Sequence, residues 1–204
     1  MNKVRFEAFS DGVFAFAITL LILGIVLPEF KNPPPSEVEL THALLHLWPN
    51  LLAYCLSFAA IGLMWHGHQA LFRLVARVDR TTIFLNLVLL GATVFIPFAT
   101  STLGAYPTMR PSTFLYGLTL TSSATANNLL FAHLDRSGAF ASHVSKPTIR
   151  QTMISYRIAW VTYAISMLTS FVVPILSFAL YLVVVGYYYV FPHGADTDLT
   201  NTSA

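Results

Sequence analysis

Five polar side chains stand near the ends of two apolar runs and could support chemistry in an otherwise apolar chain. Ser10 and Asp11 lie in the motif FSDG, and Trp65, His66 and His68 lie in WHGH. One interpretation is a helix cap, because Ser and Asp side chains accept hydrogen bonds from the unpaired N–H groups at a helix start. The other is an ionisable group at membrane depth, which needs a partner because burying a lone charge there is costly.

The second interpretation predicts a polar cluster that joins two helices. Glu7 stands four residues before Asp11 and repels it, so the partner must come from another segment. The indole N–H of Trp65 and the rings of His66 and His68 are expected at the same depth as Asp11. A metal site is not predicted, since histidines two positions apart on a helix point in different directions and no Cys or Glu is spaced to complete the set.

The sequence holds no pattern typical of an enzyme or of a nucleic-acid-binding protein. It contains no nucleophile elbow, phosphate-binding loop or GxGxxG motif. The formal net charge is only +2, and no run of Lys and Arg concentrates it. Cys55 is the single cysteine, which we expect to be buried in an apolar segment. We therefore predict a protein that is not an enzyme, needs no cofactor and binds no nucleic acid.

The composition indicates that lipid is the main solvent of this chain. Of its 204 residues, 55% are hydrophobic and 10% are charged, and the mean hydropathy is +0.65. Soluble domains usually carry about 25% charged residues. As a helix, residues 6–27 would be roughly 33 Å long, enough to cross a hydrocarbon core of about 30 Å. Glu7, Asp11 and the lack of a small-residue cleavage site argue against a signal peptide here.

The apolar runs predict an all-α integral membrane protein with one domain, residues 1–192, and a polar tail at 193–204. Residues 29–42 include three consecutive prolines and are expected to form a loop. Pro97 is expected to kink the third span, and the last long apolar stretch is divided near Ser170. The six expected transmembrane helices are residues 6–27, 44–72, 82–103, 112–134, 154–169 and 171–191.

The distribution of basic residues predicts the orientation of these spans. With six spans, only Lys31 and Arg110 of the eleven basic residues lie on the side away from the termini. Cytoplasmic loops of membrane proteins carry an excess of Lys and Arg. Both termini are therefore predicted to be cytoplasmic.

Ion conduction is compatible with the first span, although nothing in its spacing requires it. Two sides of this span follow helical spacing and neither is singled out by it: one holds Phe16, Thr19, Leu20, Leu23 and Leu27, and the other holds Ile18, Ile22 and Ile25. An apolar helix commonly faces lipid and its neighbours, but a narrow apolar constriction also gates pores by dewetting. The chain lacks TVGYG and has no acidic residue at the centre of a span, which excludes a conventional carbonyl filter or a charged ring.

The first span also resembles a known family. RFEAFSDGVFAFAITLLIL is similar to the RxxxFSD first helix of the prokaryotic potassium channels related to lysosomal transmembrane protein 175, with Arg5, Phe9, Ser10 and Asp11 matching the motif. The likeness continues through residues 47–72 and 77–90, so it covers about the first half of the chain closely. This chain departs from the family's pattern at Phe16, where an aliphatic residue is usual, and in WHGHQ, where WxNHH is usual.

The resemblance implies a six-helix subunit, four copies of which surround a central pore lined by the first helix. It implies that the residues facing the pore axis are Phe16, Thr19 or Leu20, and Leu23. It also implies a network that holds the first helix to the second, drawn from the motif and from the end of the second span: Arg5, Phe9, Ser10, Asp11, Trp65 and His68.

We therefore expect a homotetrameric channel of a bacterial inner membrane that conducts K⁺ and other monovalent cations, with modest selectivity for K⁺ over Na⁺ and a hydrophobic gate. An alternative is a proton-coupled secondary transporter that uses Asp11 and the polar fourth span, which contains Asn127 and Asn128. A third is a structural or assembly protein without transport. Single-channel steps would identify a channel, and saturable exchange would identify a transporter.

Overall fold

The computed structural model describes residues 3–30 and 34–190, and over these ranges the protein is helical, which confirms the all-α prediction. The expected tail at residues 193–204 lies outside the described residues. The helices are α1 (Lys3–Leu20), the short 3-10 helix η1 (Leu21–Gly24), α2 (Glu37–His46), α3 (Trp48–Leu74), α4 (Arg80–Val94), α5 (Ile96–Ala105), α6 (Arg110–Arg136), α7 (Lys146–Thr169) and α8 (Pro174–Val190).

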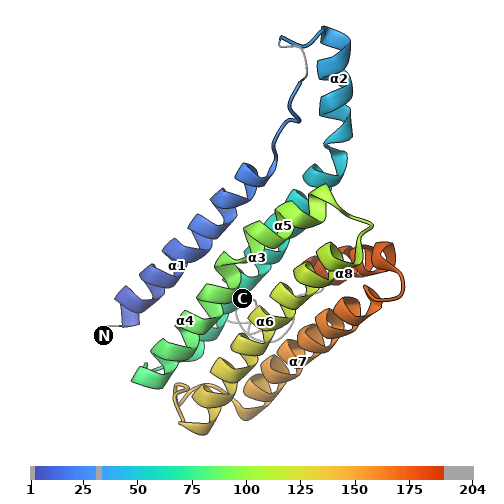
Figure 1. Ribbon diagram of the computed structural model, residues 1–204. Coiled ribbons are helices and arrows are strands. Elements are labelled where there is room, and N and C mark those ends of the chain that lie inside the picture. Colours follow the sequence, from blue (N-terminus) through green and yellow to red (C-terminus); the bar gives the residue numbers. More distant parts are fainter. Residues whose placement is uncertain (1–2, 31–33, 191–204) are drawn as a thin grey trace.

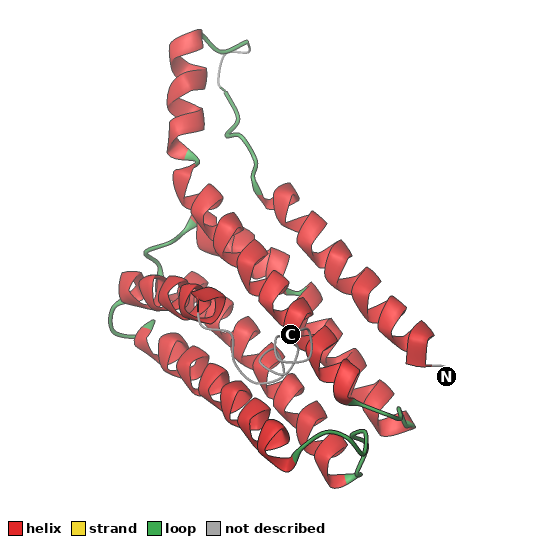
Figure 2. Ribbon diagram, turned by 180° about the vertical axis from the view of Figure 1, so that it is seen from behind, coloured by secondary structure: helices red, strands yellow, loops and turns green. Residues whose placement is uncertain are grey.

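The long helices lie side by side, with α1 at one edge of the bundle (Figures 1 and 2). Helix α1 contacts α3, α4 and, less extensively, α5, whereas α6 contacts α4, α5, α7 and α8. Helix α2 extends beyond the bundle at the end where α1 finishes (Figure 1). The subunit is therefore built around α6, and α1 is a peripheral helix.

The first helix begins earlier and ends earlier than the sequence predicts. It starts at Lys3, so Ser10 and Asp11 lie inside α1, and the interpretation of FSDG as a cap for a helix beginning at Gly12 is wrong. After Leu20 the chain tightens into η1 and then becomes extended at Ile25. Gly weakens helices, and a residue before Pro avoids the α conformation, so Gly24 and Pro28 explain the early end of the helix.

The loop expected at residues 29–42 is wrong in its second half, where α2 forms. The Ser36 hydroxyl accepts a hydrogen bond from the backbone N–H of Glu39 at 3.2 Å, and the Ser36 N–H donates to Glu39 Oε2 at 2.8 Å. This is a capping box, which the sequence SEVE encodes through its Ser and Glu three positions apart. The backbone and hydroxyl donors of Ser36 also lower the pKa of the Glu39 carboxyl. The prolines therefore prevent a helix only before Ser36, whose cap allows α2 to begin at Glu37.

The third span contains the expected interruption. Helix α4 ends at Val94 and α5 starts at Ile96, with Pro97 in the first turn of α5. Proline has no N–H to donate to the carbonyl of Thr93, so the helical ladder breaks just before it. The boundary near Ser170 is also confirmed, because α7 ends at Thr169.

Three helical stretches in the described part of the chain are long and apolar enough to cross a membrane: Lys3–Gly24, Trp48–Leu74 and Arg80–Ala105. Helices α6 and α7 have 27 and 24 residues, a sufficient length, but they carry many hydroxyl and amide side chains. Helix α8 is apolar but has 17 residues. The structure is thus a multi-helix apolar bundle, and the count of six spans stays a prediction.

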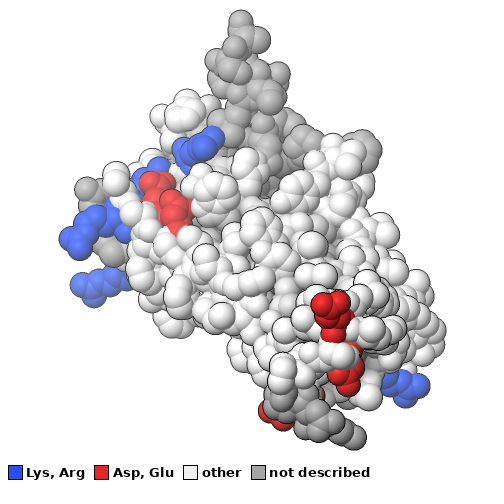
Figure 3. All heavy atoms as spheres, turned by 90° about the horizontal axis from the view of Figure 1, so that it is seen from above, with Lys and Arg blue, Asp and Glu red and all other residues white. Residues whose placement is uncertain are grey.

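Charged side chains gather at the two ends of the molecule. Figure 3 shows a mainly basic group at one end and a mainly acidic group at the other, with uncharged atoms over the middle of the face in view. A band without charge between two charged ends is the surface that a bilayer requires.

The centre of the bundle is held by hydroxyl groups as well as by apolar contacts. The Thr100 hydroxyl donates to Ser57 Oγ at 2.7 Å, and Ser57 Oγ lies 3.0 Å from the Tyr116 hydroxyl. Beside Tyr116, a Cβ atom on Gly117 would lie 2.8 Å from the Cβ of Met167 and 2.9 Å from its Cα. Helix α7 therefore approaches α6 as closely as a glycine permits.

Candidate functional site

Helix α1 and the following η1 together have a packed face and an uncovered face. Phe6, Phe14 and Ala17 are at most 1% exposed, whereas Phe16 and Leu23 are 59% and 69% exposed. The two sets alternate at helical spacing, so each forms a continuous stripe. The buried stripe fixes the helix to the rest of the subunit. The exposed stripe lies on the subunit surface, where it can contact lipid or another subunit.

A buried chain of hydrogen bonds fixes the packed face. The Ser10 hydroxyl donates to the carbonyl of Phe6 at 3.1 Å and accepts from Asn86 Nδ2 at 2.9 Å. The Asn86 amide oxygen lies 2.8 Å from His68 Nε2. Because an amide oxygen only accepts, Nε2 of His68 carries a proton in this arrangement. The chain joins α1, α4 and α3, and Ser10, Asn86 and His68 are all at most 3% exposed.

Aromatic rings surround the imidazole of His68. Its ring centroid lies 4.6 Å from that of Phe72 and 5.4 Å from that of Phe14, and the Phe6 centroid is 6.5 Å away. Close ring packing on several sides restricts the imidazole to one orientation. The hydrogen bond to Asn86 is thereby held in place by packing.

A second polar contact ties α1 to α3 through Asp11. Its Oδ1 accepts from Trp65 Nε1 at 2.9 Å and from Gln69 Nε2 at 3.1 Å. Two N–H donors on one carboxylate oxygen supply the partners that a carboxylate at membrane depth requires. The structure therefore brings Asp11 and Trp65 together, as the sequence predicts.

The single cluster predicted from the sequence is divided into two in the structure. His68 binds Asn86 rather than Asp11, and Gln69 occupies the second position on Asp11. Sequence reasoning missed both amides. A signal existed for each: Gln69 follows Trp65 by four positions and so shares its helix face, and Asn86 interrupts the apolar run IFLNLVLL.

Other predicted network residues lie elsewhere. Arg5 and Phe9 are on the exposed side of α1, and His66 is exposed on α3. The structure therefore does not bring Arg5 or Phe9 to the buried hydrogen bonds described above. Cys55, expected to be buried, is exposed on α3. In the described ranges, no three His, Cys, Asp or Glu side chains are grouped as metal ligands.

The residues predicted to line a pore lie on the uncovered face of α1 and η1. Phe16, Thr19 and Leu23 are exposed, and Leu20 is half-buried at the edge of this stripe. The Thr19 hydroxyl donates its hydrogen to the carbonyl of Phe16 at 2.8 Å. Because the hydroxyl hydrogen is used in this bond, the Thr19 oxygen remains able to accept a further contact.

The sequence that forms this site is similar to that of known channel proteins. Residues 5–97 match the family model described as endosomal/lysosomal potassium channel TMEM175. A protein named as a potassium channel from Streptomyces collinus is 39% identical over 189 residues, which cover 90% of each chain. The human protein named endosomal/lysosomal proton channel TMEM175 is 41% identical over 105 residues, which cover 48% of this chain and 20% of that one.

The fold is similar to a solved channel. The crystal structure of a lysosomal potassium-selective channel TMEM175 homolog from Chamaesiphon minutus matches with a TM-score of 0.80 and 35% identity, covering 92% of this chain and 96% of that chain. The likeness therefore extends over α6, α7 and α8 as well as over the half that carries the FSD motif.

Proposed function

This chain belongs to the TMEM175 family of potassium channels, and we propose that four copies of it form a K⁺ pore whose wall is the uncovered face of α1. It is a potassium channel and not an enzyme. The observation that carries the proposed pore wall is the division of α1 into two stripes. One stripe is fixed by Ser10, Asn86 and His68, and the other exposes large apolar side chains and one hydroxyl.

A fourfold assembly explains why an edge helix has such a face. A ring of identical subunits places the same stripe around a common axis, so a peripheral helix becomes the central one. The packed face would then work as an anchor, because the buried hydrogen bonds to α3 and α4 fix the rotation of α1 about its own axis. The rotation decides which side chains meet the ions.

The side chains on this face suggest how ions are selected. Phe16 and Leu23 offer no ligand to an ion, so a cation passing them must lose much of its hydration. Thr19 supplies a ring of hydroxyl oxygens between them, one from each subunit. K⁺ is less strongly hydrated than Na⁺ and sheds water at lower cost, which gives a modest preference for K⁺ without a carbonyl filter.

The proposed membrane placement follows from the charges. We place six spans across a bacterial inner membrane, with α6, α7 and α8 as the last three and both termini in the cytoplasm. Arg77 lies in the turn between α3 and α4 and Arg80 begins α4, and the opposite end carries acidic Glu37 and Glu39. Polar side chains of α6 and α7 can cross the bilayer because many of them bond within the bundle: Asn128 Nδ2, for example, donates to the carbonyls of Ala124 and Tyr156 at 2.9 and 3.2 Å.

The alternative of a proton-coupled transporter is not favoured. Its ionisable group, Asp11, binds Trp65 and Gln69 of α3, while Asn128 of the polar fourth span binds backbone carbonyls of α6 and α7. The relatives that match over most of their length are named as channels.

The test is ion flux in liposomes with Leu23→Ser. Replacing a large apolar side chain by a small polar one should raise K⁺ flux and lower the ratio of K⁺ to Na⁺ flux, because an ion no longer has to shed as much water. Leu168→Ser is the matched control, since Leu168 is 58% exposed on α7, away from the proposed pore. Unchanged flux with Leu23→Ser would count against the pore wall.

A further inference from the structure

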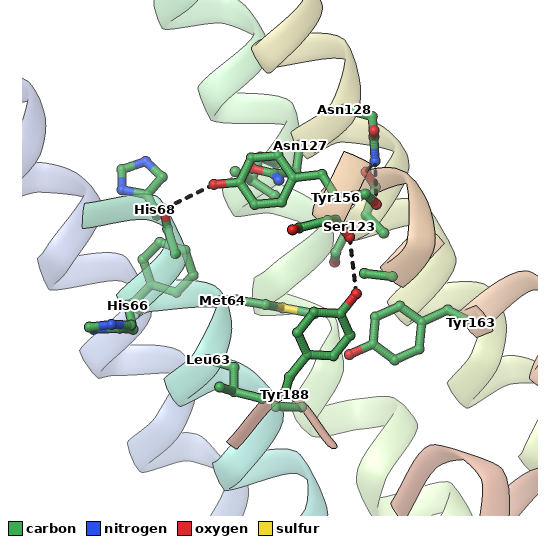
Figure 4. Close-up of a pocket in the computed structure, with 17 residues that line it drawn as sticks. Leu63, Met64, His66, His68, Ser123, Asn127, Asn128, Tyr156, Tyr163 and Tyr188 are labelled. Atoms are coloured by element: carbon green, nitrogen blue, oxygen red, sulfur yellow. Dashed lines mark hydrogen bonds between the residues drawn. The ribbon is translucent and has the colours of Figure 1, made fainter. Parts of the chain in front are cut away.

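A partly open cavity of about 140 Å³ lies between α3 and the helices α6, α7 and α8, with Phe14 of α1 and Leu89 of α4 also in its wall. Figure 4 shows side chains from these helices arranged around it. Most of the wall is apolar, with Leu63 and Met64 from α3, Ala124 from α6 and Ala159 from α7. The cavity is separate from the uncovered stripe of α1, so a molecule bound in it need not enter the pore.

Most polar groups around the cavity already have partners. The Tyr156 hydroxyl donates to the carbonyl of Gly67 at 3.1 Å, and the Tyr188 hydroxyl donates to the carbonyl of Ser155 at 3.0 Å (Figure 4). Ser123 differs from them. It lines the cavity, is 1% exposed, and its hydroxyl has no hydrogen-bond partner within the described ranges. A buried hydroxyl without a partner is unfavourable, so this group favours a ligand that completes its hydrogen bond.

The size and lining of the cavity define the ligand. An apolar protein cavity of about 150 Å³ accommodates benzene, so this cavity fits one six-membered ring. Besides the imidazole rings of His66 and His68, the lining has no ionisable side chain of Lys, Arg, Asp or Glu, so an ion would lose its hydration there without a carboxylate, ammonium or guanidinium partner. We propose that the cavity is a binding site for a small uncharged aromatic alcohol, whose ring contacts the apolar wall and whose hydroxyl bonds to Ser123.

The test measures binding of 4-fluorophenol to the purified full-length protein in detergent, by ¹⁹F NMR. Binding should be saturable and displaced by phenol. Ala124→Leu and Ala159→Leu each fill the cavity from a different helix and should abolish the saturable signal, provided that the variant elutes as the wild type does in size exclusion. Ala179→Leu, an exposed position on α8, is the control and should bind normally.

A second pair of variants tests the hydrogen bond. Ser123→Ala should weaken 4-fluorophenol binding about fivefold, the effect of one ordinary hydrogen bond, and should leave fluorobenzene binding unchanged. Ser122→Ala, its exposed neighbour, should change neither. Equal binding to wild type and both filled variants, or no effect of Ser123→Ala, would overturn the proposal. No ion flux enters the measurement, so this result is independent of the proposed pore.

Discussion

Helices α1 and α6 have opposite positions in one subunit. Helix α6 packs against α4, α5, α7 and α8, and buried residues occur along its whole length. Helix α1 and η1 contact the bundle on one side only, and their other side exposes Phe9, Phe16 and Leu23. Helix α6 combines hydrogen bonds, such as that of Asn128, with a close backbone approach at Gly117. Helix α1 has no such close approach and adds to its apolar packing the hydrogen bonds at Ser10 and Asp11.

This difference indicates a division of roles. A helix packed against four neighbours is held largely by close contacts, since a rotation would cause clashes. A helix with one bare face needs directional contacts to fix its rotation. In the proposed tetramer the rotation of α1 decides which side chains face the ions. The polar network, which fixes this rotation, would therefore determine which residues line the pore.

The largest expected effect tests the packing of α6. Gly117→Ala would place a Cβ atom against the Tyr181 hydroxyl of α8 and against the backbone of Met167, and that backbone cannot move as a flexible side chain can. Overpacking of this kind costs about 3 kcal/mol. We expect a clear fall in the thermal unfolding midpoint in detergent. Gly91→Ala is the control, because a Cβ atom there has no neighbour within 4 Å and the midpoint should hold or rise. Equal midpoints for the two variants would contradict the close approach of α7 to α6.

A somewhat smaller effect is expected at the anchor of α1. Asn86→Ala removes the amide between Ser10 and His68 and leaves both buried groups without that partner, at a cost of about 2 kcal/mol. The unfolding midpoint should fall. A double-mutant cycle with Ser10→Ala isolates the Ser10–Asn86 hydrogen bond, because the two losses should be less than additive. Additive losses would show that the two groups do not act together.

The smallest expected effect on stability concerns Asp79, in the turn between α3 and α4. Asp79 caps α4 by accepting from the Thr82 N–H at 2.7 Å, and it lies 3.0 Å from His133 of α6. The Thr82 N–H, the Thr82 hydroxyl and His133 lower the pKa of the Asp79 carboxyl from 3.8 to about 2.

Since the pKa is lower in the folded protein, the stabilisation is complete above about pH 4 and is lost as the pH falls from there towards 2. Asp79→Ala should lower stability by about 1 kcal/mol or less at neutral pH, because the side chain is half exposed. The difference from wild type should vanish near pH 2 in acid-unfolding curves. A difference that persists there would contradict the role of the carboxylate.

Much of the fold could be predicted from the sequence because apolar runs must be buried or face lipid. The bounds of α6, the end of α7 and the break before Pro97 follow from hydropathy and from proline chemistry. Helix α2 was missed because the prolines obscured the capping box of Ser36 and Glu39. The early end of α1 was missed because the apolar run continues through η1 to Leu27, whereas the α-helical backbone ends at Leu20.

The site could be predicted only in part. The pairing of Asp11 with Trp65 follows from the cost of an unpartnered carboxylate at membrane depth. The division of the cluster could not be derived, since it depends on which of several polar groups on α3 and α4 faces which side of α1. Periodicity gave two candidate faces for α1, and tertiary packing decides that Phe16 and Leu23 are outside and Phe14 and Leu21 are inside.

The most direct test of the pore wall is thiol modification of adjacent positions with opposite exposure. In a Cys55→Ser background, Leu23→Cys and Leu21→Cys proteins are reconstituted in liposomes and treated with a positively charged, membrane-impermeant methanethiosulfonate reagent. Leu23 is 69% exposed and Leu21 is 1% exposed, so K⁺ flux should be blocked in the first and unaffected in the second. Full flux through Leu23→Cys protein that mass spectrometry shows to be modified would contradict a pore lined by α1.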